Sequence, residues 1–92
     1  MSQYCRTSVE KFMVYMENRL KEKDDDCGAK SWLDNDCNID ELRNSLQTKV
    51  SILHKCCFDL DVVGARKSCI DVANFAMMIV DRIDLNKEED IA

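Results

Sequence analysis

The sequence predicts an all-α protein, organised as one domain over residues 1–92. The chain has no proline and only two glycines, whereas architectures built from strands and turns need more of both. Apolar residues recur at steps of three and four over most of its length, which is the helical period. We therefore expect an antiparallel bundle of three main helices plus a short C-terminal helix. Oligomerisation should complete this bundle, because so short a chain buries only a modest core.

The first helix is predicted over residues 3–23, with Ser2 as its cap. Its apolar stripe comprises Cys5, Val9, Phe12, Met13, Met16 and Leu20. The aspartates at 24–26 lack the alternating ligands and distal glutamate of a calcium loop, so they indicate a solvated helix exit. Residues 28–37 should form a loop around Trp32, which either covers the core or offers a stacking surface for a base.

The second helix is predicted to begin at Asn38 and to end near Cys57. Asn38 and Glu41 have the spacing of a capping box. The apolar stripe comprises Ile39, Leu42, Leu46, Leu53, Cys56 and Cys57. Lys49 lies within roughly 40° of the centre of this stripe. Either its stem packs while its ammonium reaches water, or it pairs with an inward carboxylate.

The third helix is predicted from Val62 to about Ile83, with Asp61 as its cap, and a separate short helix over residues 86–91 should follow. A polar seam within an arc of roughly 80° comprises Lys67, Asp71, Asn74 and Asp81. Most of the remaining circumference is apolar. So wide an apolar arc is unusual for a surface helix of a small monomer, so we expect a bundle core with the seam turned to solvent or to a site.

Charge and cysteine usage narrow the functional classes. A net charge of −5 argues against nucleic-acid partners and anionic membrane surfaces. The sequence has no apolar run of membrane-spanning length and no signal-peptide core, so we expect a cytoplasmic protein. None of the six cysteines forms a C-x-x-C pair, which argues against a zinc site. Most should act as small hydrophobes, and Cys27 and Cys37 should be a disulfide or exposed thiols.

Residues 68–81 read S-C-I-D-V-A-N-F-A-M-M-I-V-D. This run resembles the second half of the MazG-type nucleoside-triphosphate pyrophosphohydrolase signature, and in particular the short single-domain members of that all-α family. Those proteins tend to read E-C-A-D-V-A-N-F-A-M-M-I-A-D at this place. The likeness covers about residues 10–84, including a basic residue, Lys30, before Trp32. It is specific only over residues 68–81.

The resemblance implies a mechanism. In this family, acidic side chains in an E-x-x-E motif and an E-x-x-D motif hold Mg²⁺, which binds the triphosphate and positions a water. The products are a nucleoside monophosphate and pyrophosphate. The Asn of the D-V-A-N stretch would assist phosphate or metal binding. The nucleotide site would then comprise Lys30, Trp32, Lys49, Asp71, Asn74 and Asp81.

The sequence departs from the family where the metal binds. Ser68 replaces one glutamate, and Lys49 and Ile52 replace the two of the first motif, so only Asp71 remains of the four acidic positions. A second alignment places the first motif at residues 41–44 and keeps Glu41, but Lys49 lies on the inward face. Because one carboxylate holds Mg²⁺ poorly, we expect catalysis to be lost.

Three hypotheses follow. The first is an inactive MazG-like protein that acts by assembly, as a dimer or tetramer, or by binding a nucleoside triphosphate or another partner, with a Lys49–Asp71 salt bridge in place of the metal. The second is an active Mg²⁺-dependent pyrophosphohydrolase that recruits Glu41, Asp71 and Asp81 in another geometry. The third is a structural helical protein whose likeness to the family is fortuitous.

Overall fold

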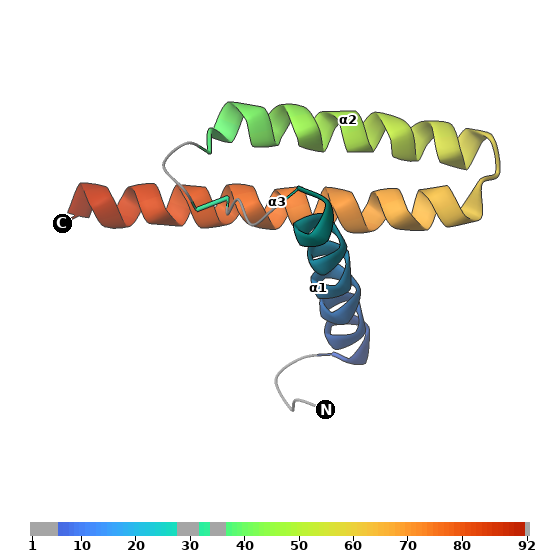
Figure 1. Cartoon of the computed structure of the whole chain (residues 1–92), viewed down its shortest axis with the longest axis horizontal. Helices are drawn as coiled ribbons and strands as arrows, with labels where there is room; N and C mark the ends of the chain where they lie inside the picture. The colour runs from blue at the N-terminus through green and yellow to red at the C-terminus, as the bar shows by residue number, and fades with distance from the viewer. Residues whose placement is uncertain (1–5, 28–31, 34–36, 92) are drawn as a thin grey trace.

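The protein is all-helical in a computed structural model that describes residues 6–27, 32–33 and 37–91. Its elements are α1 (Thr7–Cys27), α2 (Ile39–Phe58) and α3 (Val62–Ile91), and the described residues contain no strand. Helices α2 and α3 lie side by side as an antiparallel hairpin, and α1 crosses α3 steeply (Figure 1). The prediction of an all-α fold with three main helices is therefore confirmed. No helix in these described ranges has the length and apolar character needed to cross a membrane.

The ends of the hairpin follow the predicted capping. The Asn38 side chain accepts a hydrogen bond from the backbone N–H of Asp40 at 2.7 Å, and α2 begins at the next residue. At the tight turn, Leu60 has a φ of 60°, in the left-handed region. The Asp61 carboxylate then accepts from the N–H of Gly64 at 3.0 Å, which caps α3. A Cβ on Gly64 would lie 2.8 Å from the Cys56 sulfur, so glycine lets the first turn of α3 approach α2.

Helix α1 ends at Cys27 instead of near residue 23, so the acidic run continues the helix rather than following it. The predicted cap, Ser2, lies outside the described residues. The buried side of α1 also differs from the prediction, because Val9 and Met13 are about half exposed. Tyr15, Met16 and Arg19 contact α3 instead, which rotates the packed face by roughly 60° from the predicted stripe.

The prediction of a separate short C-terminal helix is wrong. Helix α3 runs without interruption to Ile91, and Asn86 lies inside it rather than at a cap. Asn86 resembles a cap in sequence, but a cap residue alone does not end the preceding helix. No glycine or proline stands between residue 83 and residue 91 to break the backbone hydrogen bonding.

The polar seam of α3 faces the other helices. We call Ser68, Asp71 and Asn74 the inner face of α3; they are only 5%, 5% and 3% exposed. These three, with Ile70 and Leu42, are the buried residues of the described chain. Lys67, at the N-terminal end of the seam, is exposed. Asp71 and Asn74 of the seam therefore lie at the centre of the packing, because their partners are on α1 and α2.

The opposite side of α3 carries exposed apolar residues within an arc of roughly 60°. We call Cys69, Ala76, Val80 and Ile83 the outer face of α3. Val80 is 54% exposed, so this part of the predicted apolar arc does not form core within the single chain, whereas Ile70 of the same arc is buried. Cys57, assigned to the stripe of the second helix, is likewise exposed. Cys37, Cys56, Cys57 and Cys69 are free thiols, so the alternative of a Cys27–Cys37 disulfide is not realised.

Candidate functional site

The carboxylate of Asp71 is paired with a cation from each of the other two helices. Arg19 on α1 donates from Nε to Oδ1 at 2.8 Å and from Nη2 to Oδ2 at 3.4 Å. Lys49 on α2 places its Nζ 3.3 Å from Oδ2. The predicted Lys49–Asp71 pair is confirmed, and the alternative of a fully solvated Lys49 is wrong. We call these three residues the Asp71 cluster.

The neighbouring cations stabilise the charged form of Asp71. Burial raises the pKa of Asp71, but the hydrogen bonds and charge of Arg19, together with the charge of Lys49, outweigh burial and hold the pKa below its usual value. The hydrogen bond to Asp71 raises the pKa of Arg19. Glu22 accepts from Nη1 of Arg19 at 2.8 Å, so the two cations face two carboxylates. The charges at the helix junction are therefore balanced.

Asn74 lies about one turn after Asp71 on the same face of α3. Its Nδ2 donates to the backbone carbonyl of Met16 at 3.2 Å and so ties α3 to α1 a second time. Its Oδ1 is buried, and no donor in the described part of the chain reaches it. An unmatched buried acceptor is costly, so this oxygen is a place where a water or another donor would be stabilised.

Asp81 lies far from Asp71 along α3. The two are separated by ten residues of α3, a rise of about 15 Å. Asp81 accepts from the indole Nε1 of Trp32 at 3.0 Å, and Arg82 donates to the carbonyl of Leu33 at 3.2 Å. These bonds attach the described part of the α1–α2 connection to α3 and leave Trp32 half buried. Trp32 therefore contacts α3 through Asp81, and both of its predicted roles stay predictions.

The structure thus divides the predicted nucleotide-site residues. Lys49, Asp71 and Asn74 come together where the three helices meet, Asp81 and Trp32 form a separate pair, and Lys30 lies outside the described residues. Glu41 is exposed in the first turn of α2. No group that joins Glu41, Asp71 and Asp81 is formed.

The residues at the positions that the resemblance assigns to a metal do not fit a magnesium ion. Mg²⁺ takes hard oxygen ligands in octahedral geometry. Here Ser68 and Asp71 are buried, Lys49 is paired with Asp71, and Ile52 is exposed. Within the described ranges, no three His, Cys, Asp or Glu side chains are close enough together to hold a metal ion. Asp71 is the single carboxylate at these positions, and two protein cations already pair with it.

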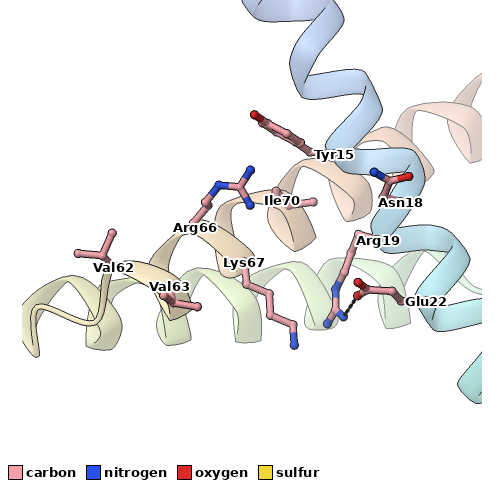
Figure 2. A pocket seen from close by; sticks show the side chains of 9 residues that line it. All are labelled: Tyr15, Asn18, Arg19, Glu22, Val62, Val63, Arg66, Lys67 and Ile70. Carbon is pink, nitrogen blue, oxygen red and sulfur yellow. Dashed lines mark hydrogen bonds and ion pairs between the residues drawn. The ribbon is translucent and has the colours of Figure 1, made fainter.

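A groove lies beside the Asp71 cluster, between α1 and the N-terminal half of α3 (Figure 2). It has a volume of about 510 Å³. It is lined by Tyr15, Asn18, Arg19, Glu22, Val62, Val63, Arg66, Lys67 and Ile70. The guanidinium carbon of Arg66 lies 4.3 Å from the centroid of the Tyr15 ring. We call this feature the α1–α3 groove.

Sequence reasoning missed Arg19, the residue with the shortest contact to Asp71. A signal existed, because Arg19 follows the stripe residue Met16 by three positions and so shares its side of the helix. The apolar period favoured Val9 and Met13 instead, and nothing in the sequence showed that a charged residue would be turned inward. Arg66 was missed for a similar reason, since its contact with Tyr15 depends on how α1 crosses α3.

Comparison of this chain with known protein families, with curated proteins and with solved structures found no match. The likeness to the MazG family therefore stays a prediction from residues 68–81.

Proposed function

We propose that this chain is an inactive MazG-like domain that acts by assembly with copies of itself rather than by hydrolysing nucleotides. The pairing of both Asp71 oxygens with Arg19 and Lys49 carries the proposal. Two like charges at ~4 Å repel by about 4 kcal/mol at an effective dielectric of ~20. A divalent cation at Asp71 would therefore have to displace both side chains. The salt bridges would stand at Asp71 in place of the metal that the resemblance implies.

The outer face of α3 supports the assembly role. Four apolar residues on one side of a helix are exposed in the single chain, and covering them would be favourable by about 25 cal/mol per Å². The hairpin turn adds Phe58 and Leu60, which are 89% and 84% exposed. A dimer or tetramer in the cytoplasm would bury such surfaces. The net charge of −5 favours neither nucleic acid nor anionic membranes as the partner.

Catalysis is tested by titrating the protein with Mg²⁺ and a mixed set of nucleoside triphosphates in a calorimeter, with pyrophosphate release assayed on the same samples. We expect no Mg²⁺-dependent release. Turnover would overturn the proposal and favour the active enzyme with an altered metal site. Nucleotide binding without turnover would replace assembly by nucleotide sensing as the role.

A restored metal site provides a sharper comparison. The triple variant Lys49→Glu, Ile52→Glu, Ser68→Glu returns acidic residues to all positions that the family would use. We expect Mg²⁺ to raise the melting temperature of this variant and to leave that of the natural chain unchanged. Lys55→Glu is the matched control, because Lys55 is an exposed lysine of the same helix. Equal responses of the triple variant and this control would contradict the family assignment of these positions.

Assembly is tested by light scattering coupled to size exclusion, with Val80→Glu placing a charge on the outer face of α3. We expect the natural chain to have a mass of two or four protomers and the variant to be smaller. Lys55→Glu again serves as control and should keep the natural mass. A natural chain that is monomeric at high concentration would overturn the assembly role.

A further inference from the structure

The α1–α3 groove combines an apolar wall with a cationic wall. Val62 and Val63, at the start of α3, are 77% and 80% exposed, and Ile70 lies two turns further along the helix. Figure 2 shows the two valines at one end of the groove and Arg19 with Glu22 at the other. The volume of about 510 Å³ falls within the ~300–1,000 Å³ range of small-molecule sites.

The described residues leave positive charge in excess on the cationic wall. Three cations line the groove, and its single carboxylate, Glu22, is already bonded to Arg19. In the described part of the chain, no carboxylate lies within ion-pair distance of Arg66 or Lys67. The chain as a whole carries a net charge of −5, so this local excess of positive charge runs against the composition. Such an excess favours an anion.

Tyr15 holds one of the two available cations in place. The guanidinium of Arg66 stacks over the Tyr15 ring at 4.3 Å, and Figure 2 shows Arg66 extending toward that ring while Lys67 extends away from it. A stacked guanidinium loses little further freedom when it binds an anion, and its planar fork matches the oxygens of a phosphate or carboxylate. The flexible ammonium of Lys67 supplies a second positive charge.

We propose that the α1–α3 groove binds a small organic anion, whose charged group contacts Arg66 and Lys67 and whose apolar or aromatic body lies against Val62, Val63 and Ile70. The exposed cations would bind a bare anion only weakly, because water and salt screen them. The apolar wall supplies the remaining affinity and selects ligands that carry a hydrophobic body. The groove would bind such a ligand whether or not the Asp71 cluster descends from a metal site.

The test titrates the full chain, without Mg²⁺ or nucleotide, with phenyl phosphate and phenylacetate. Heteronuclear NMR shifts identify the residues that respond. We expect saturable binding at one site with a dissociation constant on the order of 1 mM, as suits ligands of this size. Shifts should be largest for residues of the groove. Inorganic phosphate and phenol, which are the head group and the body alone, should each bind at least about tenfold more weakly than phenyl phosphate, if both walls contribute.

Substitutions test the contribution of each wall of the groove to binding. Arg66→Gln and Lys67→Gln should each weaken phenyl phosphate binding by about five- to tenfold, a usual range for one charged contact. Val63→Ser should weaken phenyl phosphate but not inorganic phosphate. Lys55→Gln removes an exposed lysine outside the groove and should change neither affinity. None of these substitutions touches Arg19, Lys49 or Asp71, so the Asp71 cluster remains intact in every variant.

Several outcomes would overturn the inference. No saturation by 10 mM phenyl phosphate, taken as about ten times the expected dissociation constant, would show that the groove is not a site. If inorganic phosphate bound as tightly as phenyl phosphate, the groove would act only as a patch of surface charge, without a contribution from its apolar wall. Equal weakening by Lys55→Gln would show non-specific attraction to the chain. Because the assay contains neither Mg²⁺ nor nucleotide, these outcomes leave the inactive-domain proposal untouched.

Discussion

The inner and outer faces of α3 have exchanged the roles expected for a small helical protein. The inner face holds a serine, an aspartate and an asparagine, each at most 5% exposed, at the centre of the structure. The outer face holds apolar residues that are exposed. Both faces belong to one continuous helix, so helix propensity does not separate them. Their partners do, because α1 and α2 bring Arg19 and Lys49 to one side only.

This contrast shows that charge pairing can decide which side of a helix is packed. An unpaired aspartate in the middle of the packing would be costly, whereas an exposed valine costs little. Asp71 must therefore face the two cations, and the apolar side is turned outward by the geometry of the same helix. An outward apolar side is then available for a second chain.

The largest effect is expected from Asp71→Asn on the inner face. The substitution keeps the shape of the side chain but leaves the mostly buried Arg19 and Lys49 without their negative partner. We expect the free energy of unfolding to fall by about 3 kcal/mol, as for other broken buried ion pairs. Urea denaturation measures this change. A loss below about 0.5 kcal/mol, the range of ordinary surface substitutions, would show that the inner face does not orient the helix.

The next largest effects are expected from replacing each of the two cations that pair with Asp71. Arg19→Met should lower the free energy of unfolding by about 2 kcal/mol and Lys49→Met by about 1 kcal/mol. Arg19 has the greater effect because it makes two hydrogen bonds to Asp71 and its side chain is 13% exposed, against 25% for Lys49. Both are measured by urea denaturation. If Lys49→Met raises stability, the Lys49–Asp71 pair is not required for folding.

A pH dependence follows from the pKa of Asp71. Because its folded pKa lies below the usual 3.8, the unfolded chain takes up the proton first as the pH falls. The stabilisation by Asp71 is fully present above about pH 5 and is lost as the pH falls through 3.8 and then through the folded pKa. Denaturation curves between pH 6 and pH 2 measure the loss. Asp71→Asn should have a shallower acid dependence, and an identical one would contradict the assignment.

The smallest effect is expected on the outer face. Val80→Ser in dilute, monomeric protein should change the free energy of unfolding by no more than about 0.5 kcal/mol, because the side chain is 54% exposed. Ile70→Ala on the same helix removes a buried side chain and should cost about 3 kcal/mol. Under the proposed assembly, Val80→Ser should become more destabilising as the protein concentration rises. A large effect at all dilutions would show that this face is packed within one chain.

Much of the backbone architecture could be predicted from the sequence. The starts of α2 and α3 follow from Asn38 and Asp61, whose short side chains accept hydrogen bonds from the first turn of each helix. The inward position of Lys49 follows from its place in the stripe of the second helix. The end of α3 was not predictable in the same way, because Asn86 is compatible both with a cap and with a helix interior.

By itself, the sequence determined three helices, the antiparallel hairpin and the presence of a polar seam on the third helix. These features depend on local periodicity and on capping, and both are properties of nearby residues. Only the tertiary structure decided that the seam faces inward and that Arg19 joins Lys49 at Asp71. Arg19 and Asp71 are 52 residues apart, so their pairing depends on how α1 crosses α3. Apolar periodicity carries no information about that crossing, because it ranks side chains by hydrophobicity and not by the partner that neutralises a buried charge.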